Sequence, residues 1–163
     1  MILPIVLALS TLLCALVAGF LFAFAAVIMP GMKQLKDIEF LSVFQLIDGV
    51  IQNKQFFFML VWMGSIFTLI TAAVLGSSSF GSLRQLLIFS SLVIYVAGVQ
   101  IPTMLINVPL NNYIQSLDIK DLTDVAGKVA RRKFESRWVL WNKIRTVFAI
   151  IVTAILLFLL AFM

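Results

Sequence analysis

Charged residues are absent from four long stretches of the chain, and these stretches set its organisation. They cover residues 1–32, 55–83, 85–117 and 146–163. A helix rises about 1.5 Å per residue, so roughly 20 apolar residues cross the ~30 Å hydrocarbon core of a bilayer. We predict membrane-spanning helices at Ile2–Met29, Phe56–Gly76, Leu86–Val108 and Thr146–Met163. Helices are favoured over strands because backbone groups in lipid must be hydrogen-bonded within their own segment.

The predicted fold class is an all-α integral membrane protein, a four-transmembrane-helix bundle forming a single domain over residues 1–163. A cleaved signal peptide is the alternative for the first stretch. That stretch has no basic residues ahead of its apolar run, and the run is about twice as long as in a signal peptide. We therefore expect a retained span that ends at Met29-Pro30-Gly31, a pattern typical of a helix stop.

Two of the three loops carry helical patterns of their own. Residues 37–53 place apolar side chains on one face at Phe40, Phe44, Ile47 and Ile51, with Ser42, Gln45, Asp48 and Gln52 elsewhere. This amphipathic helix either anchors at the membrane surface or covers the bundle mouth as a lid. Residues 123–145 form a second such helix, capped by Thr123 or Asp121, with one face made of Phe134, Trp138, Trp141 and Arg145.

Composition agrees with a lipid environment and predicts an orientation. The chain is 63% apolar and 12% charged, with a mean hydropathy of +1.14 and a net charge of +5. Of its 12 basic residues, all but Arg84 lie in the first and third loops. The positive-inside rule then places both long loops in the cytoplasm and both termini outside. We expect Arg131-Arg132-Lys133 to face lipid headgroups rather than nucleic acid, because no nucleic-acid-binding module accompanies it.

Histidine is absent and cysteine occurs once, which excludes several classes of metal site and catalytic mechanism. The chain has no histidine, which excludes histidine-ligated metal sites, Ser–His–Asp and Cys–His catalysis and a histidine pH switch. Its single cysteine, Cys14, lies in an apolar run and is expected to pack as a small hydrophobe. We expect no cofactor and no metal.

A polar stripe on the third span is the most informative pattern. Gln100, Thr103, Asn107 and Asn111 recur at i, i+3, i+7 and i+11, one per helical turn. Polar groups inside a membrane face the bundle interior and need partners there. The stripe is therefore either hydrogen-bonding glue between helices or the lining of a cavity.

The same region contains two prolines and several possible polar neighbours. In a continuous helix, Pro102 and Pro109 free the carbonyls of Gly98 and Leu105 and predict a kinked end to the span. The third span leaves the membrane on the side where the fourth begins. We expect one polar group at that mouth, with Gln45 and Asp48 above it, made of Asn107, Asn111, Trp138, Asn142 and Arg145.

Several of these motifs resemble a known family. They are the Met29-Pro30-Gly31 ending, Gln45-Leu46-Ile47-Asp48, Asn107-Val108-Pro109-Leu110-Asn111 and Trp138-x-x-x-Asn142-x-x-Arg145. The chain is similar over nearly its whole length to the bacterial branch of a four-helix membrane family, mostly of unknown function, that includes the fungal anthrone oxygenases. The resemblance implies a bacterial inner-membrane protein and action on a polycyclic aromatic without bound metal or flavin. It also implies an asparagine where this chain has Asp48.

Three functions stay open at this point. In the first, a cofactor-free oxygenase or redox enzyme acts on a lipophilic aromatic or quinol, with Arg145 stabilising its anion and Asp48 as the base. Its expected ligand-binding residues are Gln100, Asn107, Asn111, Trp138, Trp141 and Asn142. The second is a non-catalytic protein that binds lipid or a partner, and the third is a small transporter. The expected partners are the bilayer and a lipophilic aromatic ligand, with no nucleic acid; an oligomer is compatible with the sequence.

Overall fold

The computed structural model describes residues 2–53, 55–77 and 82–162, and every regular element in these residues is helical. Four segments are long and apolar enough to cross a membrane: Ile2–Met32, Phe56–Gly76, Leu83–Gln115 and Asp124–Ala161. The predicted all-α bundle with four spans is therefore confirmed. In chain order its elements are α1 (Ile2–Ala23), η1 (Phe24–Ile28), α2 (Met29–Met32), α3 (Asp37–Gln52), α4 (Phe56–Gly76), α5 (Leu83–Tyr95), η2 (Val96–Gln100), η3 (Thr103–Asn107), α6 (Val108–Gln115), η4 (Ile119–Asp121) and α7 (Asp124–Ala161).

Three of the span boundaries differ from the prediction. The first span continues to Met32, because the π-helical turn η1 comes directly before α2 and lets the helix continue past Pro30. The third span extends to Gln115. The predicted helix over 123–145 and the fourth span are one continuous helix, α7, whose N-cap is Thr123: its hydroxyl accepts from Ala126 N–H at 3.3 Å. The predicted terminal residue of that span, Met163, lies outside the described residues.

The third span absorbs its prolines through π-helical turns. The segments η2 and η3 are π-helices on either side of Pro102, and η3 also precedes Pro109. A π turn contains an extra residue, which lets a helix pass a proline without leaving the bundle and often marks a functional site. Gln100 and Asn107, the last residues of the two turns, are buried at 7% and 2% exposure.

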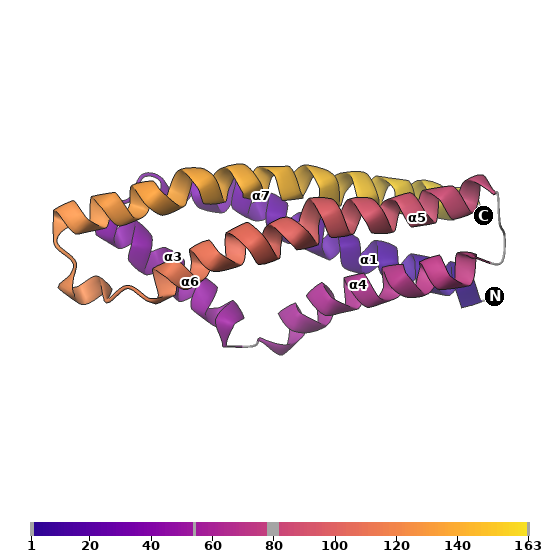
Figure 1. Cartoon of the computed structure of the whole chain (residues 1–163), viewed down its shortest axis with the longest axis horizontal. Helices are drawn as coiled ribbons and strands as arrows, with labels where there is room; N and C mark the ends of the chain where they lie inside the picture. Colours follow the sequence, from indigo (N-terminus) through magenta and orange to yellow (C-terminus); the bar gives the residue numbers. More distant parts are fainter. Residues whose placement is uncertain (1, 54, 78–81, 163) are drawn as a thin grey trace.

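The helices pack as a bundle with an extension at one end. The helix α1 packs against α4 and α7, while α5 also packs against α4 and α7. The helix α3 packs instead against α6 and the first half of α7, and these three elements form what we call the loop end of the molecule. Figure 1 shows α1 beginning and α7 ending together at the opposite end of the bundle.

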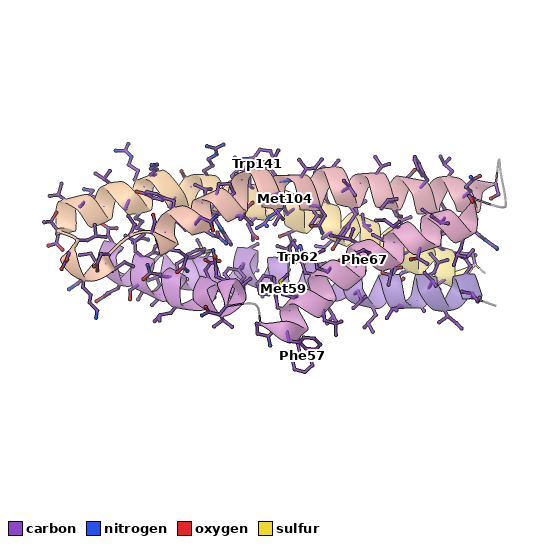
Figure 2. All side chains as sticks on the ribbon, turned by 60° about the horizontal axis from the view of Figure 1, so that its bottom comes forward. Phe57, Met59, Trp62, Phe67, Met104 and Trp141 are labelled. Carbon is purple, nitrogen blue, oxygen red and sulfur yellow. The ribbon has the colours of Figure 1, made fainter. Side chains whose placement is uncertain are left out.

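Two apolar cores lie one above the other along this bundle. The first fills the membrane-spanning part and includes Leu7, Cys14, Tyr95 and Leu156. The second fills the loop end and is rich in aromatic side chains: Phe24, Phe40, Phe44, Phe134 and Trp138. On the outer surface of the bundle, large apolar side chains such as Phe57 (Figure 2) and Phe67 are exposed, as expected of a lipid-facing surface.

Candidate functional site

A cavity of about 430 Å³ lies where the two cores meet. Every span and the amphipathic helix α3 contribute to its wall. Its aromatic lining consists of Phe20, Phe24, Phe44, Phe58, Trp62 and Trp138. Its polar lining consists of Asp48, Gln100, Thr103, Asn107, Asn111, Asn142 and Arg145. An apolar pocket with a few convergent polar groups is the usual form of a small-molecule site.

Arg145 is the most unusual member of this wall. It is 4% exposed, although a guanidinium is rarely buried without a charged partner. Its Nη1 donates to Thr103 Oγ1 at 2.9 Å and its Nη2 to Asn142 Oδ1 at 3.0 Å. Its Cζ lies 5.9 Å from the centroid of the Trp138 ring, within range of a weak cation–π contact. Among the described residues Arg145 forms no ion pair, so its charge is compensated only by neutral groups.

Within the part of the chain that the structure describes, three buried polar atoms around the cavity have no hydrogen-bond partner. They are Gln100 Nε2, Asn107 Oδ1 and Arg145 Nε, and each belongs to a residue of the cavity wall. Buried polar atoms are rarely left unsatisfied, because each loses its bonds to water and gains nothing in return. Two donors and one acceptor gathered at one cavity therefore indicate a place where a polar molecule or a water is held.

A second polar group, the Asp48 cluster, closes the loop end of the cavity. Asp48 is 3% exposed; its Oδ1 accepts from Asn111 Nδ2 at 2.7 Å. Its Oδ2 accepts from Gln115 Nε2 at 2.9 Å and from Gln52 Nε2 at 3.1 Å. The indole N–H of Trp138 donates to Asn111 Oδ1 at 2.7 Å, which extends the network to α7. One carboxylate thereby joins α3, α6 and, through Asn111, α7.

Other side-chain amides of the cavity wall hold helices together. Asn107 Nδ2 donates to the Trp138 carbonyl at 3.3 Å, and Asn142 Nδ2 donates to the Leu21 carbonyl at 3.0 Å. The indole N–H of Trp62 donates to Gln100 Oε1 at 3.1 Å. The two interpretations of the polar stripe therefore coexist, because the same side chains that bridge helices also form the cavity wall.

The structure brings together seven of the eight residues that the sequence singled out: Asp48, Gln100, Asn107, Asn111, Trp138, Asn142 and Arg145. Their roles in binding or catalysis stay predictions. Trp141 is the exception: it is half-buried and lies outside the cavity wall (Figure 2). The helical wheel also placed Asp48 away from the apolar face of 37–53, whereas it is buried among amides.

Four of the six aromatic residues of the cavity wall were not predicted from the sequence. Phe20 and Phe24 on the first span and Phe58 and Trp62 on α4 look like ordinary lipid-facing residues in a linear pattern. The ring pairs Phe20–Phe24, Phe20–Phe58 and Phe58–Trp62 have centroids 5.0, 5.1 and 5.5 Å apart. The sequence feature that could have indicated this part of the wall is Trp62, because its indole N–H needs an acceptor inside the membrane.

The family follows from a comparison with known proteins. The anthrone oxygenase family model matches residues 55–155, more than half of the chain and nearly all of the region that supplies the polar wall. The chain belongs to the anthrone oxygenase family. No curated protein and no solved structure shows a significant match.

The family match divides the site into two parts. Gln100, Asn107, Asn142 and Arg145 lie within the region matched to the anthrone oxygenase family. Asp48 and the aromatic residues from the first span precede it. In the described residues, no group of three or more Asp, Glu or Cys side chains is arranged to hold a metal ion.

Proposed function

We propose that the protein is a membrane oxygenase that binds a lipophilic aromatic in the cavity and oxidises it with dioxygen. The observation that carries this proposal is Arg145, a buried cation beside an aromatic-lined cavity. Among the described residues Arg145 has no ion pair, and its Nε has no hydrogen-bond partner. Membership of the anthrone oxygenase family supplies the substrate class, a polycyclic aromatic such as anthrone.

The electrostatics of the cavity favour a ligand that becomes negatively charged. A buried guanidinium is costly when only neutral groups surround it, and an anion beside it recovers part of that cost. An anthrone has no charge in its ground state but gains one on its oxygen when its methylene group loses a proton. Arg145 would therefore bind the anion more tightly than the neutral substrate, which lowers the barrier to proton loss.

The oxidation itself balances with dioxygen alone. The methylene carbon loses a proton to a base, and the resulting carbanion, delocalised onto the oxygen, transfers electrons to dioxygen. A carbon–oxygen bond then forms, giving a hydroperoxide once a proton is returned. Loss of water from the hydroperoxide leaves a ketone, so that one methylene and one dioxygen become one ketone and one water. The protein's part is to hold the ring, stabilise the anion and move the proton.

Asp48 is the carboxylate that the described cavity wall contains, which makes it the candidate base. Its two oxygens already accept three hydrogen bonds from side-chain amides of Asn111, Gln115 and Gln52. They also hold α3 over the cavity, so Asp48 is a positioning residue as well under this proposal. Asp48→Asn separates the two roles, because an amide can keep a hydrogen-bonded contact but cannot accept the proton.

The direct test is Arg145→Met. Methionine has a similar length and suits an apolar surrounding, so the variant should fold. We expect oxygen uptake with anthrone to fall on the order of a hundredfold, the usual effect of removing one oxyanion donor. The matched control is Lys143→Gln, an exposed cation two residues away on α7, which should retain full activity. Equal rates for Arg145→Met and the wild type would overturn the proposal.

A non-catalytic role in binding lipid or a partner is the second candidate. The bonds from Asn107 and Asn142 to backbone carbonyls favour it, since such bonds need no ligand. Under this alternative, Asn142→Ala lowers thermal stability while no aromatic substrate is ever turned over. An aromatic compound that copurifies with the protein and is lost in Arg145→Met, as seen by mass spectrometry, would count against this alternative.

We further propose that the loop end faces the cytoplasm of a bacterial inner membrane, with both termini outside. The support is the charge distribution, because all basic residues except Arg84 belong to the first and third loops. A reporter fused to the C-terminus tests this orientation: alkaline phosphatase should be active there and green fluorescent protein dark. The reverse pattern would overturn it.

A further inference from the structure

One side of the cavity is open toward the membrane. The polar wall is deeply buried, with Asn142 at 1% and Arg145 at 4% exposure. The edge between α4 and η3 is different: Met59 is 39% exposed, Met63 40% and Met104 69%. Figure 2 shows Met59 and Trp62 on α4 and Met104 on the third span, on the two sides of this edge. We call the edge formed by the three methionines the lateral opening.

The packing of the helices explains why the cavity opens here. The helix α4 packs against α1 and α5, whereas α6, which continues the third span, packs against α3 and α7. The segment η3 packs on α6 and α7 as well, so α4 and η3 belong to different packing groups. Flexible methionine side chains line the boundary between these groups, and methionine adapts easily to ligands of varied shape.

The lateral opening faces lipid rather than water. Met59 and Met63 belong to the span Phe56–Gly76, and Met104 belongs to the span Leu83–Gln115. The route from the loop end is closed by Phe44, at 2% exposure, and by Asp48 with its three amide donors. A molecule dissolved in the bilayer therefore meets an open edge, while a molecule in water meets a packed one.

We infer that the lateral opening is the route by which the substrate enters, and that the substrate is a membrane-dissolved aromatic ring system carrying a hydrocarbon chain. The ring occupies the cavity beside Arg145, and the chain passes between Met63 and Met104 into the lipid. The size of the cavity supports this division, because about 430 Å³ is near the small end for ligand pockets and holds a ring system without a long tail. The identity of the ring rests on the proposed function; the lateral opening does not.

The test measures binding without turnover. Wild type and variants in nanodiscs are titrated without oxygen with two probes, anthrone and a decyl-substituted anthrone. We expect Met63→Trp and Met104→Trp to fill the opening. They should raise the Kd of the decyl probe roughly tenfold, a loss of about 1.4 kcal/mol, and change the Kd of anthrone by less than about twofold.

Two neighbouring residues give matched controls. Leu105 is as exposed as Met104, and Leu60 lies beside Met59 at 55% exposure, but neither contributes to the cavity wall. Leu105→Trp and Leu60→Trp should bind both probes like the wild type. Equal loss of the decyl probe in controls and opening variants would overturn the inference, as would wild-type binding by Met63→Trp and Met104→Trp.

A second pair of variants tests the inference even if the tryptophan variants do not fold. Met63→Ala and Met104→Ala remove volume from exposed positions and should widen the opening, so that the decyl probe associates roughly threefold faster. An unchanged or slower association rate would contradict the inference. If the decyl probe binds as expected but wild-type protein consumes no oxygen with anthrone, the lateral opening stands and the proposed function falls.

Discussion

At the scale of single residues, the site depends on a few hydrogen bonds between side chains that lie far apart in the sequence. Trp138 illustrates this, because its ring contacts Phe44 and Phe24 while its indole N–H donates to Asn111 Oδ1 at 2.7 Å. Asn111 in turn donates to Asp48. A change at Trp138 should therefore affect the position of α3 as well as local packing.

The first prediction concerns Trp138→Phe, which keeps an aromatic ring but removes the donor to Asn111. We expect a loss of about 1–3 kcal/mol in unfolding free energy, because an acceptor is left without its donor and some buried area is lost. Thermal unfolding in detergent measures it. Trp141→Phe, on the same helix but half-exposed and outside the cavity, should change stability by less than about 0.5 kcal/mol. Similar losses for both tryptophans would show that the Asn111 bond contributes little.

Some residues of the site could be predicted from the sequence and others could not. The stripe from Gln100 to Asn111 could be recognised because its members recur once per turn of one helix. The burial of Asp48 could not, because its partners Asn111 and Gln115 lie more than sixty positions away. A helical wheel describes a single helix and contains no information on neighbouring helices. Asp48 is buried because α6 brings amide donors to it.

At the scale of elements, the spans were predictable and their internal irregularities were not. A charge-free run of about 20 residues is a local property of the sequence. In lipid such a run forms a helix, because its backbone groups must hydrogen-bond within the segment. The inward face of α7 depends on its neighbours instead. Its buried residues Phe134, Trp138 and Asn142 advance in two steps of four, which turns the inward face past Trp141. The π turns likewise reflect tertiary packing around the prolines.

The second prediction tests the close approach of η2 to α7. A Cβ added at Gly98 would lie 2.7 Å from Phe148 Cβ, closer than side chains pack, so one helix must move. We expect Gly98→Ala to destabilise the protein by about 1–3 kcal/mol in a denaturant titration, despite alanine's higher helix propensity. A double-mutant cycle with Phe148→Ala should show a favourable coupling between the two positions.

The control for this prediction is another helical glycine. A Cβ at Gly19 would meet no atom within 4 Å, so Gly19→Ala removes backbone freedom without a clash. We expect it to leave stability unchanged or raise it by up to about 1 kcal/mol. If Gly98→Ala also stabilises the protein, η2 and α7 do not pack as closely as the structure places them.

At the scale of the whole molecule, the same long helices contribute to two cores. One core is surrounded by lipid and the other lies at the loop end, next to water. The membrane core includes Leu7 and Leu156, and lipid around it leaves its backbone hydrogen bonds without competition from water. The loop-end core includes Phe40 and Phe134 and lies among the charged residues of α3 and α7. The cavity lies at the junction of the two cores. One of its walls belongs to the membrane core, and the other belongs to the loop-end core, which water and denaturant can reach.

The third prediction follows from this division. In nanodiscs with moderate urea, backbone amides of α3 should exchange with deuterium before those of α1 and α4, because α3 packs mainly on α6 and the first half of α7, outside the membrane-spanning core. Phe134→Ala should advance the exchange of α3, since Phe134 is fully buried with its ring centroid 4.4 Å from that of Phe44. Leu156→Ala, fully buried in the membrane core, should leave the exchange of α3 unchanged. Simultaneous exchange of α3 and the spans in both variants would instead make the molecule one cooperative unit, and the cavity would then open only when the whole bundle unfolds.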